Sequence, residues 1–180
     1  LLGEHLGDCE GPCQRACPAQ MNIPLMLRQI AAGDHGAALA TVKRDIALPA
    51  TLGRICPAPC ETECNRKELE GAVNINKIER AIGDYGLEKK LGLRMLSEEK
   101  KDKKVAVIGG GPSGVSAAYQ LARRGYPVKI FEATEKAGGV LRWGIPGYRL
   151  PEDVLDAEIQ AVLDLGVEIE YGVKIGKDIS

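Results

Sequence analysis

A glycine-rich turn between two short apolar runs constrains the fold of this chain more than any other feature of its sequence. The turn, 109–114, reads Gly-Gly-Gly-Pro-Ser-Gly and follows the apolar run 105–108, which is typical of a buried parallel strand. Residues 113–124 have helical composition and stop at Gly125, and 128–132 form a second strand-like run. A strand, a turn, a helix and a strand in this order predict a βαβ unit with a parallel sheet.

The spacing of the glycines predicts that this turn binds the pyrophosphate of a dinucleotide, as in Rossmann-like domains. Gly109 permits a tight turn, Gly111 lets the pyrophosphate approach the backbone, and Gly114 lets helix and strand pack closely. The phosphates would then meet the unpaired N–H groups at the start of the following helix. The other residues of this predicted site are Gly110, Pro112 and Ser113.

An acidic residue and a second pair of glycines extend the predicted nucleotide site. Glu132 ends the second strand-like run, where a carboxylate can accept hydrogen bonds from ribose hydroxyls. Because a carboxylate there repels a 2′-phosphate, we expect this turn to hold FAD or NAD rather than NADP. Gly138 and Gly139 give a second stretch of backbone able to approach a bulky cofactor, but an ordinary surface turn accounts for them equally well.

Composition and hydropathy exclude several classes of partner. The 24 basic and 25 acidic residues give a formal net charge of -1, which does not indicate a nucleic-acid partner. No apolar run approaches the roughly 20 residues that cross a bilayer, and no secretion signal opens the chain. We therefore expect a cytoplasmic protein with no membrane partner. Because the chain begins without Met and stops soon after the strand-like run 167–171, we expect it to be part of a longer protein.

The pattern of apolar residues differs between the two halves of the chain. In the first 90 residues apolar side chains recur at helical spacing, for example at Ile23 and Leu27, and no alternating strand pattern appears. We therefore expect an α-helical domain at 1–90, a solvated linker of mixed charge at 91–103, and the first part of a Rossmann-like α/β domain at 104–180.

Six cysteines in the helical half predict a metal site. They form two triplets, Cys9, Cys13 and Cys17, then Cys56, Cys60 and Cys64. Metal binding is favoured over disulfides because cytosolic thiols are kept reduced. Thiolates at short spacing, followed by a distant ligand, are typical of iron–sulfur clusters, and a cysteine before proline recurs in ferredoxins. Structural zinc is the alternative, although it prefers closed sets of four ligands.

Glu79 is a further candidate ligand. It falls within the helical apolar stripe of Ile75, Ile78 and Ile82, where an unpaired carboxylate would be costly. Pairing with a nearby arginine would account for this position, and so would coordination of a cluster.

With both motifs considered, the chain resembles the N-terminal part of the glutamate synthase small-subunit family. That family includes the amino-terminal half of dihydropyrimidine dehydrogenase and the large subunit of NADH-dependent ferredoxin:NADP oxidoreductases. The similarity covers nearly the whole chain. It is carried by four segments, 13–18, 53–64, 109–114 and 138–151, the last reading Gly-Gly-Val-Leu-Arg-Trp-Gly-Ile-Pro-Gly-Tyr-Arg-Leu-Pro.

The resemblance implies that the helical domain holds two four-iron four-sulfur clusters. One cluster would be bound by Cys17, Cys56, Cys60 and Glu79. The other would be bound by Cys13 and Cys64 together with ligands from the first cysteine loop. Relatives usually have Cys-x2-Cys-x4-Cys-x3-Cys-Pro in that loop, whereas this chain has only Cys9, shifted by one position. The eighth ligand would then come from His5, Asp8 or a cysteine upstream of Leu1.

The resemblance also implies an FAD site and an overall function. Besides the first glycine turn and Glu132, FAD would contact Lys136, Gly138, Gly139, Val140, Arg149 and Ile179, with the adenine near Ile175 or Ile179. An NAD(P)H domain would lie beyond residue 180. The chain would pass electrons from NAD(P)H through FAD and the clusters to a partner subunit or fused domain. No catalytic acid, base or nucleophile is indicated, and a zinc-stabilised nucleotide-binding scaffold without turnover is the alternative.

Overall fold

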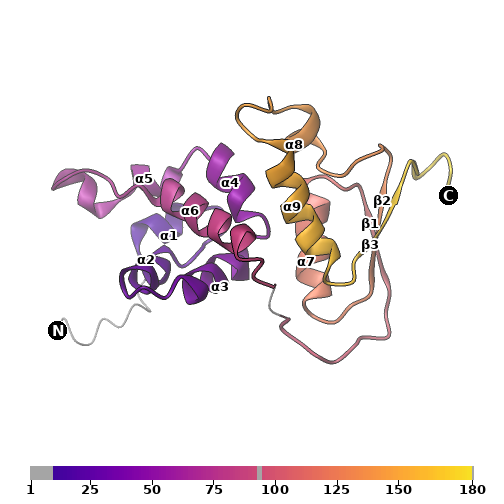
Figure 1. Cartoon of the computed structure of the whole chain (residues 1–180), viewed down its shortest axis with the longest axis horizontal. Coiled ribbons are helices and arrows are strands. Elements are labelled where there is room, and N and C mark those ends of the chain that lie inside the picture. The colour runs from indigo at the N-terminus through magenta and orange to yellow at the C-terminus, as the bar shows by residue number, and fades with distance from the viewer. Residues whose placement is uncertain (1–9, 93–94, 180) are drawn as a thin grey trace. The chain divides into compact units, whose positions relative to one another are not determined.

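The computed structural model describes residues 10–92 and 95–179 of the 180-residue chain. The chain divides into two compact units, the first ending at Lys89 and the second beginning at Lys90. The first is helical and the second contains a parallel sheet with helices, which confirms the predicted fold class (Figure 1). Within the two described ranges, no helix has the length and apolar composition that a membrane span requires.

Short helices joined by tight loops build the first unit. They are α1 (Pro12–Ala16), α2 (Ile23–Ala31), α3 (His35–Asp45), α4 (Pro49–Ile55), α5 (Pro59–Thr62), the 3₁₀ helix η2 (Asn65–Glu68) and α6 (Ile75–Glu88). The start of α2 is fixed by Asn22, whose side chain accepts a hydrogen bond of 3.0 Å from the N–H of Leu25. Met26, Val42 and Ile75 lie in the core that α2, α3 and α6 enclose.

Two glycines allow α4 and α6 to pack with their backbones in contact. A Cβ atom on Gly53 would lie 2.5 Å from the Cβ of Arg80, and one on Gly83 would lie 2.5 Å from the backbone nitrogen of Ala50. Larger residues would force the helices apart. This packing matters for the candidate site because α4 ends directly before Cys56 and α6 carries Glu79.

The second unit is built around three parallel strands. Its elements are β1 (Val105–Ile108), α7 (Pro112–Ala122), β2 (Val128–Glu132), α8 (Val140–Trp143), α9 (Glu152–Leu163) and β3 (Glu168–Tyr171). The strand order is β1-β2-β3, with Val107 opposite Ile130 and Ile130 opposite Ile169. Helix α7 contacts β1, β2 and α9, so α7 and α9 lie side by side (Figure 1).

Strand β1 is less buried than its composition predicts. Ile108 is 71% exposed, whereas Ile130 of the neighbouring strand is 1% exposed. The reason is that burial alternates along β1: Val105 and Val107 are partly covered, while Ala106 and Ile108 on the other face are exposed. A continuous apolar run predicts helices on both faces of a sheet. A sheet with one exposed face is compatible with the incomplete domain that the sequence predicts.

Candidate functional site

The first glycine turn has the geometry of a nucleotide-binding turn. Gly109 has φ +92°, a left-handed conformation that side chains rarely adopt. A Cβ atom on Gly114 would overlap the carbonyl oxygen of Gly109, so the fold itself requires this glycine. A Cβ atom on Gly111 would make only an ordinary contact of 3.8 Å with the Cα of Gly139. The protein therefore leaves space beside Gly111, where the motif predicts the pyrophosphate.

The N-terminal end of α7 is open to a ligand. Gly111 is its N-cap residue, and no side chain makes a capping hydrogen bond there. Pro112 and Ser113 in the first turn are exposed. A helix start without a side-chain cap leaves N–H groups and the positive end of the helix dipole for an anion.

Glu132 points its carboxylate at the glycine turn. It is 7% exposed at the end of β2. Its Oε2 accepts a hydrogen bond of 2.6 Å from the Gly110 N–H, and its Oε1 accepts two of 2.8 Å from the N–H and hydroxyl of Thr134. Burial raises the pKa of Glu132, but these hydrogen bonds outweigh it and lower the pKa overall. An ionised carboxylate is an acceptor only, so any ligand group that contacts Glu132 has to be a hydrogen-bond donor.

The second glycine turn lies against the first. The N–H of Gly138 donates a hydrogen bond of 2.8 Å to the carbonyl oxygen of Gly110. A Cβ atom on Gly139, which has φ +50°, would lie 2.8 Å from the Cα of Gly111. From the sequence, a cofactor contact and a plain surface turn explained Gly138 and Gly139 equally well. Their contact with Gly110 and Gly111 makes them part of the same cradle.

The remaining predicted nucleotide contacts are at exposed positions. Lys136 is 53% exposed and forms an ion pair of 3.6 Å with Glu152. Val140, which follows the second glycine turn, is 64% exposed. Arg149 is exposed in the loop after α8. Ile179 is 42% exposed and forms an isolated bridge with Ile175 beyond β3.

Described cysteines of the two triplets come together because α1, which contains Cys13, packs against α5, which contains Cys60. Cys60 is 7% exposed within the helical core, and Cys13 and Cys17 pack against that core. The described cysteines, Cys13, Cys17, Cys56, Cys60 and Cys64, are all free thiols. Cys9 lies outside the described residues, as do His5 and Asp8, the candidates for an eighth ligand.

The loop between Cys56 and Cys60 is shaped around a sulfur atom. Ala58 adopts a left-handed conformation with φ 54° and ψ 53°. Its N–H donates a hydrogen bond of 3.4 Å to the Sγ of Cys56. Hydrogen bonds from backbone N–H groups to cysteine sulfurs are one of the means by which proteins tune iron–sulfur clusters.

The thiols fall into two electrostatic groups. Burial, with added repulsion from Cys17, Glu61 and Cys56, raises the pKa of Cys60 to about 12. Burial also raises the pKa of Cys13, and repulsion from Cys64 and Cys17 adds to it. Cys60 is thus close to Cys17 and Cys56, and Cys13 is close to Cys64. Metal binding at these sulfurs has to displace protons.

Glu79 is buried on α6, which contacts both α5 and α4. It is 6% exposed, as its place in the apolar stripe predicts. Helix α6 packs against α5, which contains Cys60, and against α4, which leads into Cys56. Two arginines of these helices, Arg54 and Arg80, ion-pair with Asp84, at 2.7 and 3.6 Å.

These residues fit a cluster better than a single metal ion. Within 10–92 and 95–179, no three Cys, His, Asp or Glu side chains are close enough to hold one ion. Ligands of a cluster stand further apart than those of one zinc, and thiolates suit iron and sulfide. Two buried N–H donors, Arg54 Nε and Asn76 Nδ2, also have no acceptor in the described part of the chain. Sulfur atoms of a bound cluster are acceptors that such donors can use.

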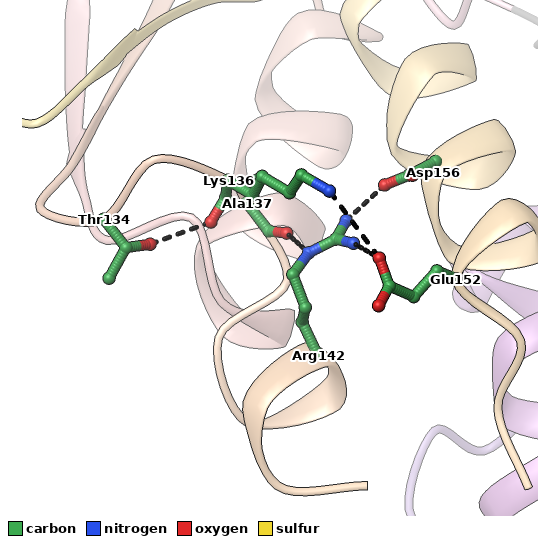
Figure 2. A network of polar contacts seen from close by, with 6 residues as sticks. All are labelled: Thr134, Lys136, Ala137, Arg142, Glu152 and Asp156. Atoms are coloured by element: carbon green, nitrogen blue, oxygen red, sulfur yellow. Dashed lines mark hydrogen bonds and ion pairs between the residues drawn. The ribbon is translucent and has the colours of Figure 1, made fainter. Parts of the chain in front are cut away.

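The sequence analysis missed Arg142. Its guanidinium contacts the carbonyl oxygen of Ala137 and two carboxylates of α9, Glu152 and Asp156 (Figure 2). The carboxylates lie 10 and 14 residues further along the chain. No local periodicity predicts contacts at such separations. The one available signal in the sequence was the pair of acidic residues Glu152 and Asp156, four positions apart, shortly after Pro151.

Comparison with known proteins assigns each unit to a family. Residues 6–91 match the family described as dihydropyrimidine dehydrogenase domain II, 4Fe-4S cluster. Residues 107–172 match the NAD(P)-binding Rossmann-like domain. These matches cover the cysteine triplets with Glu79 in one case and both glycine turns in the other.

Curated relatives contain both units in the same order. The chain is 40% identical over 171 residues to the NADPH-Fe(3+) oxidoreductase subunit beta of Geobacter sulfurreducens, covering 94% of this chain and 25% of that one. It is 41% identical over 192 residues to the NADP(+)-dependent formate dehydrogenase subunit beta of Moorella thermoacetica, covering 94% and 27%. It is 35% identical over 174 residues to the NAD-dependent dihydropyrimidine dehydrogenase subunit PreT of Salmonella typhimurium, covering 95% and 42%.

The chain thus spans less than half the length of each of these relatives. Each of their names describes an oxidoreductase or dehydrogenase that uses a pyridine nucleotide, and each relative is named as a subunit. Together with the two family matches, the relatives confirm the resemblance seen in the motifs. The chain thus carries a region of the dihydropyrimidine dehydrogenase domain II, 4Fe-4S cluster family followed by one of the NAD(P)-binding Rossmann-like family, and over nearly all of its length it is similar to oxidoreductase subunits.

Proposed function

We propose that this chain is an electron-transfer module that carries FAD and two four-iron four-sulfur clusters. The observation that carries the proposal is the packing of α1 on α5. It gathers described cysteines of both triplets into one unit of a chain whose other unit brings two glycine turns together. FAD accepts a hydride from a pyridine nucleotide, and iron–sulfur clusters pass electrons on singly. The residues of this chain bind and orient these groups.

One cluster would be bound by Cys17, Cys56 and Cys60, with Glu79 as its fourth ligand. Cys17 and Cys56 lie close enough to Cys60 to raise its pKa, and Glu79 is buried on the helix that packs against α5. The N–H of Ala58 would keep its hydrogen bond to the Cys56 sulfur. A buried carboxylate among thiolates is a hard donor in a soft set, which would make this cluster electronically distinct.

The second cluster would be bound by Cys13 and Cys64, which form the other thiol group, together with Cys9. Six cysteines and Glu79 provide seven of the eight ligands that two clusters need. His5, Asp8 or a residue upstream would provide the eighth. Proximity of the two groups through Cys17 supports placing both clusters in the helical unit.

FAD would lie with its pyrophosphate beside Gly111 at the start of α7, where the protein leaves space and no side chain caps the helix. Glu132 would accept a hydrogen bond from a ribose hydroxyl, and its charge would disfavour a 2′-phosphate. The predicted contacts of Lys136, Val140, Arg149 and Ile179 would complete the site. The pyridine nucleotide named in each relative would then bind elsewhere in the protein and deliver its electrons to the flavin.

The acceptor would be a partner subunit or a fused domain, because each relative is named as a subunit and is more than twice as long as this chain. Formate, Fe(3+) and pyrimidines appear only in the names of relatives. They differ from one another, so the acceptor of this protein is left open.

Anaerobic titration of the purified protein with dithionite, which needs no nucleotide-binding domain, tests the proposal. We expect the flavin absorbance to bleach and EPR signals of reduced clusters to appear, because both groups accept electrons. A protein that binds zinc and a nucleotide but shows neither change would contradict electron transfer. It would support the zinc-stabilised scaffold instead.

A further inference from the structure

Arg142 is held at the second glycine turn by hydrogen bonds and ion pairs. Its side chain is 3% exposed, although its two acidic partners are 63% and 53% exposed. The Nε–H donates a hydrogen bond of 2.7 Å to the carbonyl oxygen of Ala137, and one terminal nitrogen lies 3.2 Å from Oε2 of Glu152. The other terminal nitrogen donates to Oδ1 of Asp156. All three guanidinium nitrogens are therefore used at once (Figure 2).

This network fastens the second glycine turn to α9. Ala137 directly precedes Gly138, and Lys136 adds an ion pair of 3.6 Å to the same oxygen of Glu152. Thr134 lies at the other end of the turn. Its hydroxyl oxygen is 2.8 Å from both the carbonyl oxygen of Lys136 and Oε1 of Glu132 in β2, so the two acceptors share its single proton (Figure 2). The turn is therefore tied on one side to β2 and on the other to a helix.

The fastened turn is also one wall of the nucleotide cradle. Gly138 donates its hydrogen bond to Gly110, and a Cβ atom on Gly139 would lie 2.8 Å from the Cα of Gly111, so residue 139 has no room for a side chain. Glycine turns are conformationally free by themselves. A wall made of two such turns keeps its shape only if side chains outside it hold it in place.

We propose that Arg142 is a positioning residue of the nucleotide site, one that pre-organises the turn at 136–140 for the cofactor. The inference rests on the proposed FAD function of the same cradle. Arg142 contacts the turn and α9 in this structure, and it acts on the ligand through the backbone that it holds. A turn that is already ordered loses less conformational freedom when the cofactor binds, which strengthens binding.

Charge and geometry both select arginine here. A guanidinium presents five N–H donors in a planar fork, so it can bind a carbonyl and two carboxylates in different directions. Lysine could neutralise Glu152 or Asp156 but has no Nε–H to hold the Ala137 carbonyl. Methionine has similar length and would keep the packing of the stem without any donor.

The test measures FAD affinity in apoprotein prepared from the purified protein, with Arg142→Met, Arg142→Lys and the control Arg124→Met. Arg124 also donates hydrogen bonds to protein acceptors in the second unit, the carbonyl and side chain of Gln120 at the end of α7. We expect roughly tenfold weaker binding for Arg142→Met, because charge-assisted hydrogen bonds that order the site are lost. Arg142→Lys should be intermediate, and Arg124→Met should bind like wild type.

A second readout separates positioning from general stability. Hydrogen exchange at 134–143 in the FAD-free protein should be faster in Arg142→Met than in wild type, while exchange in β1 and β2 stays unchanged. Trp143, the single tryptophan of the chain, reports the same turn by its fluorescence. Should Arg142→Met prove unstable, Asp156→Asn removes one arm of the network at an exposed residue and is expected to weaken FAD binding less.

The outcomes distinguish this inference from the proposed function. If wild-type protein binds FAD and Arg142→Met binds it equally well, Arg142 is not a positioning residue and the proposed function stands. Uniformly faster exchange across the whole second unit would also overturn the inference, because it would show a purely structural role. If wild-type apoprotein binds no FAD, the proposed function fails, and the inference fails with it.

Discussion

At the scale of single residues, two glycines of the same turn differ in why a side chain would be unfavourable. Gly114 is required by the protein, because any side chain would overlap the Gly109 carbonyl oxygen. Gly111 has a backbone conformation open to any residue, with φ -75° and ψ -177°, and a Cβ there would make an ordinary contact. If Gly111 is required, the requirement comes from a ligand.

Alanine substitutions at these two glycines should therefore behave differently. Gly111→Ala should keep the thermal stability of the second unit and weaken FAD binding by roughly tenfold or more, because its methyl group faces the pyrophosphate. Gly114→Ala should lower stability by about 1–3 kcal/mol through overpacking. Thermal unfolding followed by FAD titration checks both. Equal losses of stability in the two variants would show that Gly111 is also structural.

Glu79 has two alternative roles, as a cluster ligand or as a structural carboxylate, and substitutions distinguish them. As a ligand it should give one cluster its distinct character, so Glu79→Ala should make that cluster labile and change its EPR signal, and Glu79→Cys should shift its reduction potential. Glu88→Ala is the matched control, because Glu88 lies on the same helix and its side chain is 72% exposed. Unchanged iron content, EPR spectrum and potential in both Glu79 variants would make Glu79 a structural carboxylate.

At the scale of secondary-structure elements, the contact between α4 and α6 positions the ligands. Gly83→Ala places a methyl group 2.5 Å from the backbone nitrogen of Ala50, so we expect a loss of about 1–3 kcal/mol in the helical unit and a loss of iron. Gly36→Ala in α3 is the control, because its Cβ would meet only Asp34 at 3.7 Å. It should be neutral or stabilising by up to about 1 kcal/mol. Thermal unfolding followed by circular dichroism and an iron assay check both variants. Full retention of iron in Gly83→Ala would show that the contact between α4 and α6 does not position the cluster ligands.

Elements with strong periodicity could be predicted from the sequence, and elements defined by distant contacts could not. The predicted run at 128–132 is β2, and Ile23 and Leu27 lie in α2 as expected. Helices α1, α5 and α8 span 4 or 5 residues, too short to show a helical repeat. Their positions come from tertiary packing.

The candidate site shows the same division. The glycine turn, Glu132 and the cysteine triplets could be found because each is a local motif with a known spacing. The contact of Gly138 with Gly110 spans 28 residues, and the Arg142 network joins a turn to a later helix. Such contacts depend on how the chain folds back on itself, which spacing alone does not specify. The exposure of Ile108 could not be predicted either, because an apolar strand has the same sequence whether one or both of its faces are covered.

At the scale of the whole molecule, the chain joins two units whose motifs are both typical of binding redox cofactors. One unit gathers thiols from two segments about 40 residues apart, and the other forms a cradle from two glycine turns. A formal net charge of -1 gives no general attraction for polyanions, so recognition depends on these sites. The relatives place both units within longer oxidoreductase subunits.

The most direct test of this account is the content of iron, acid-labile sulfide and zinc in the anaerobically purified and reconstituted protein. Two clusters predict about eight iron and eight sulfide per chain and no stoichiometric zinc. The same measurement on Cys60→Ser should give roughly half of that iron, because Cys60 belongs to only one proposed ligand set. A colourless protein with one zinc and no iron would contradict the central claim.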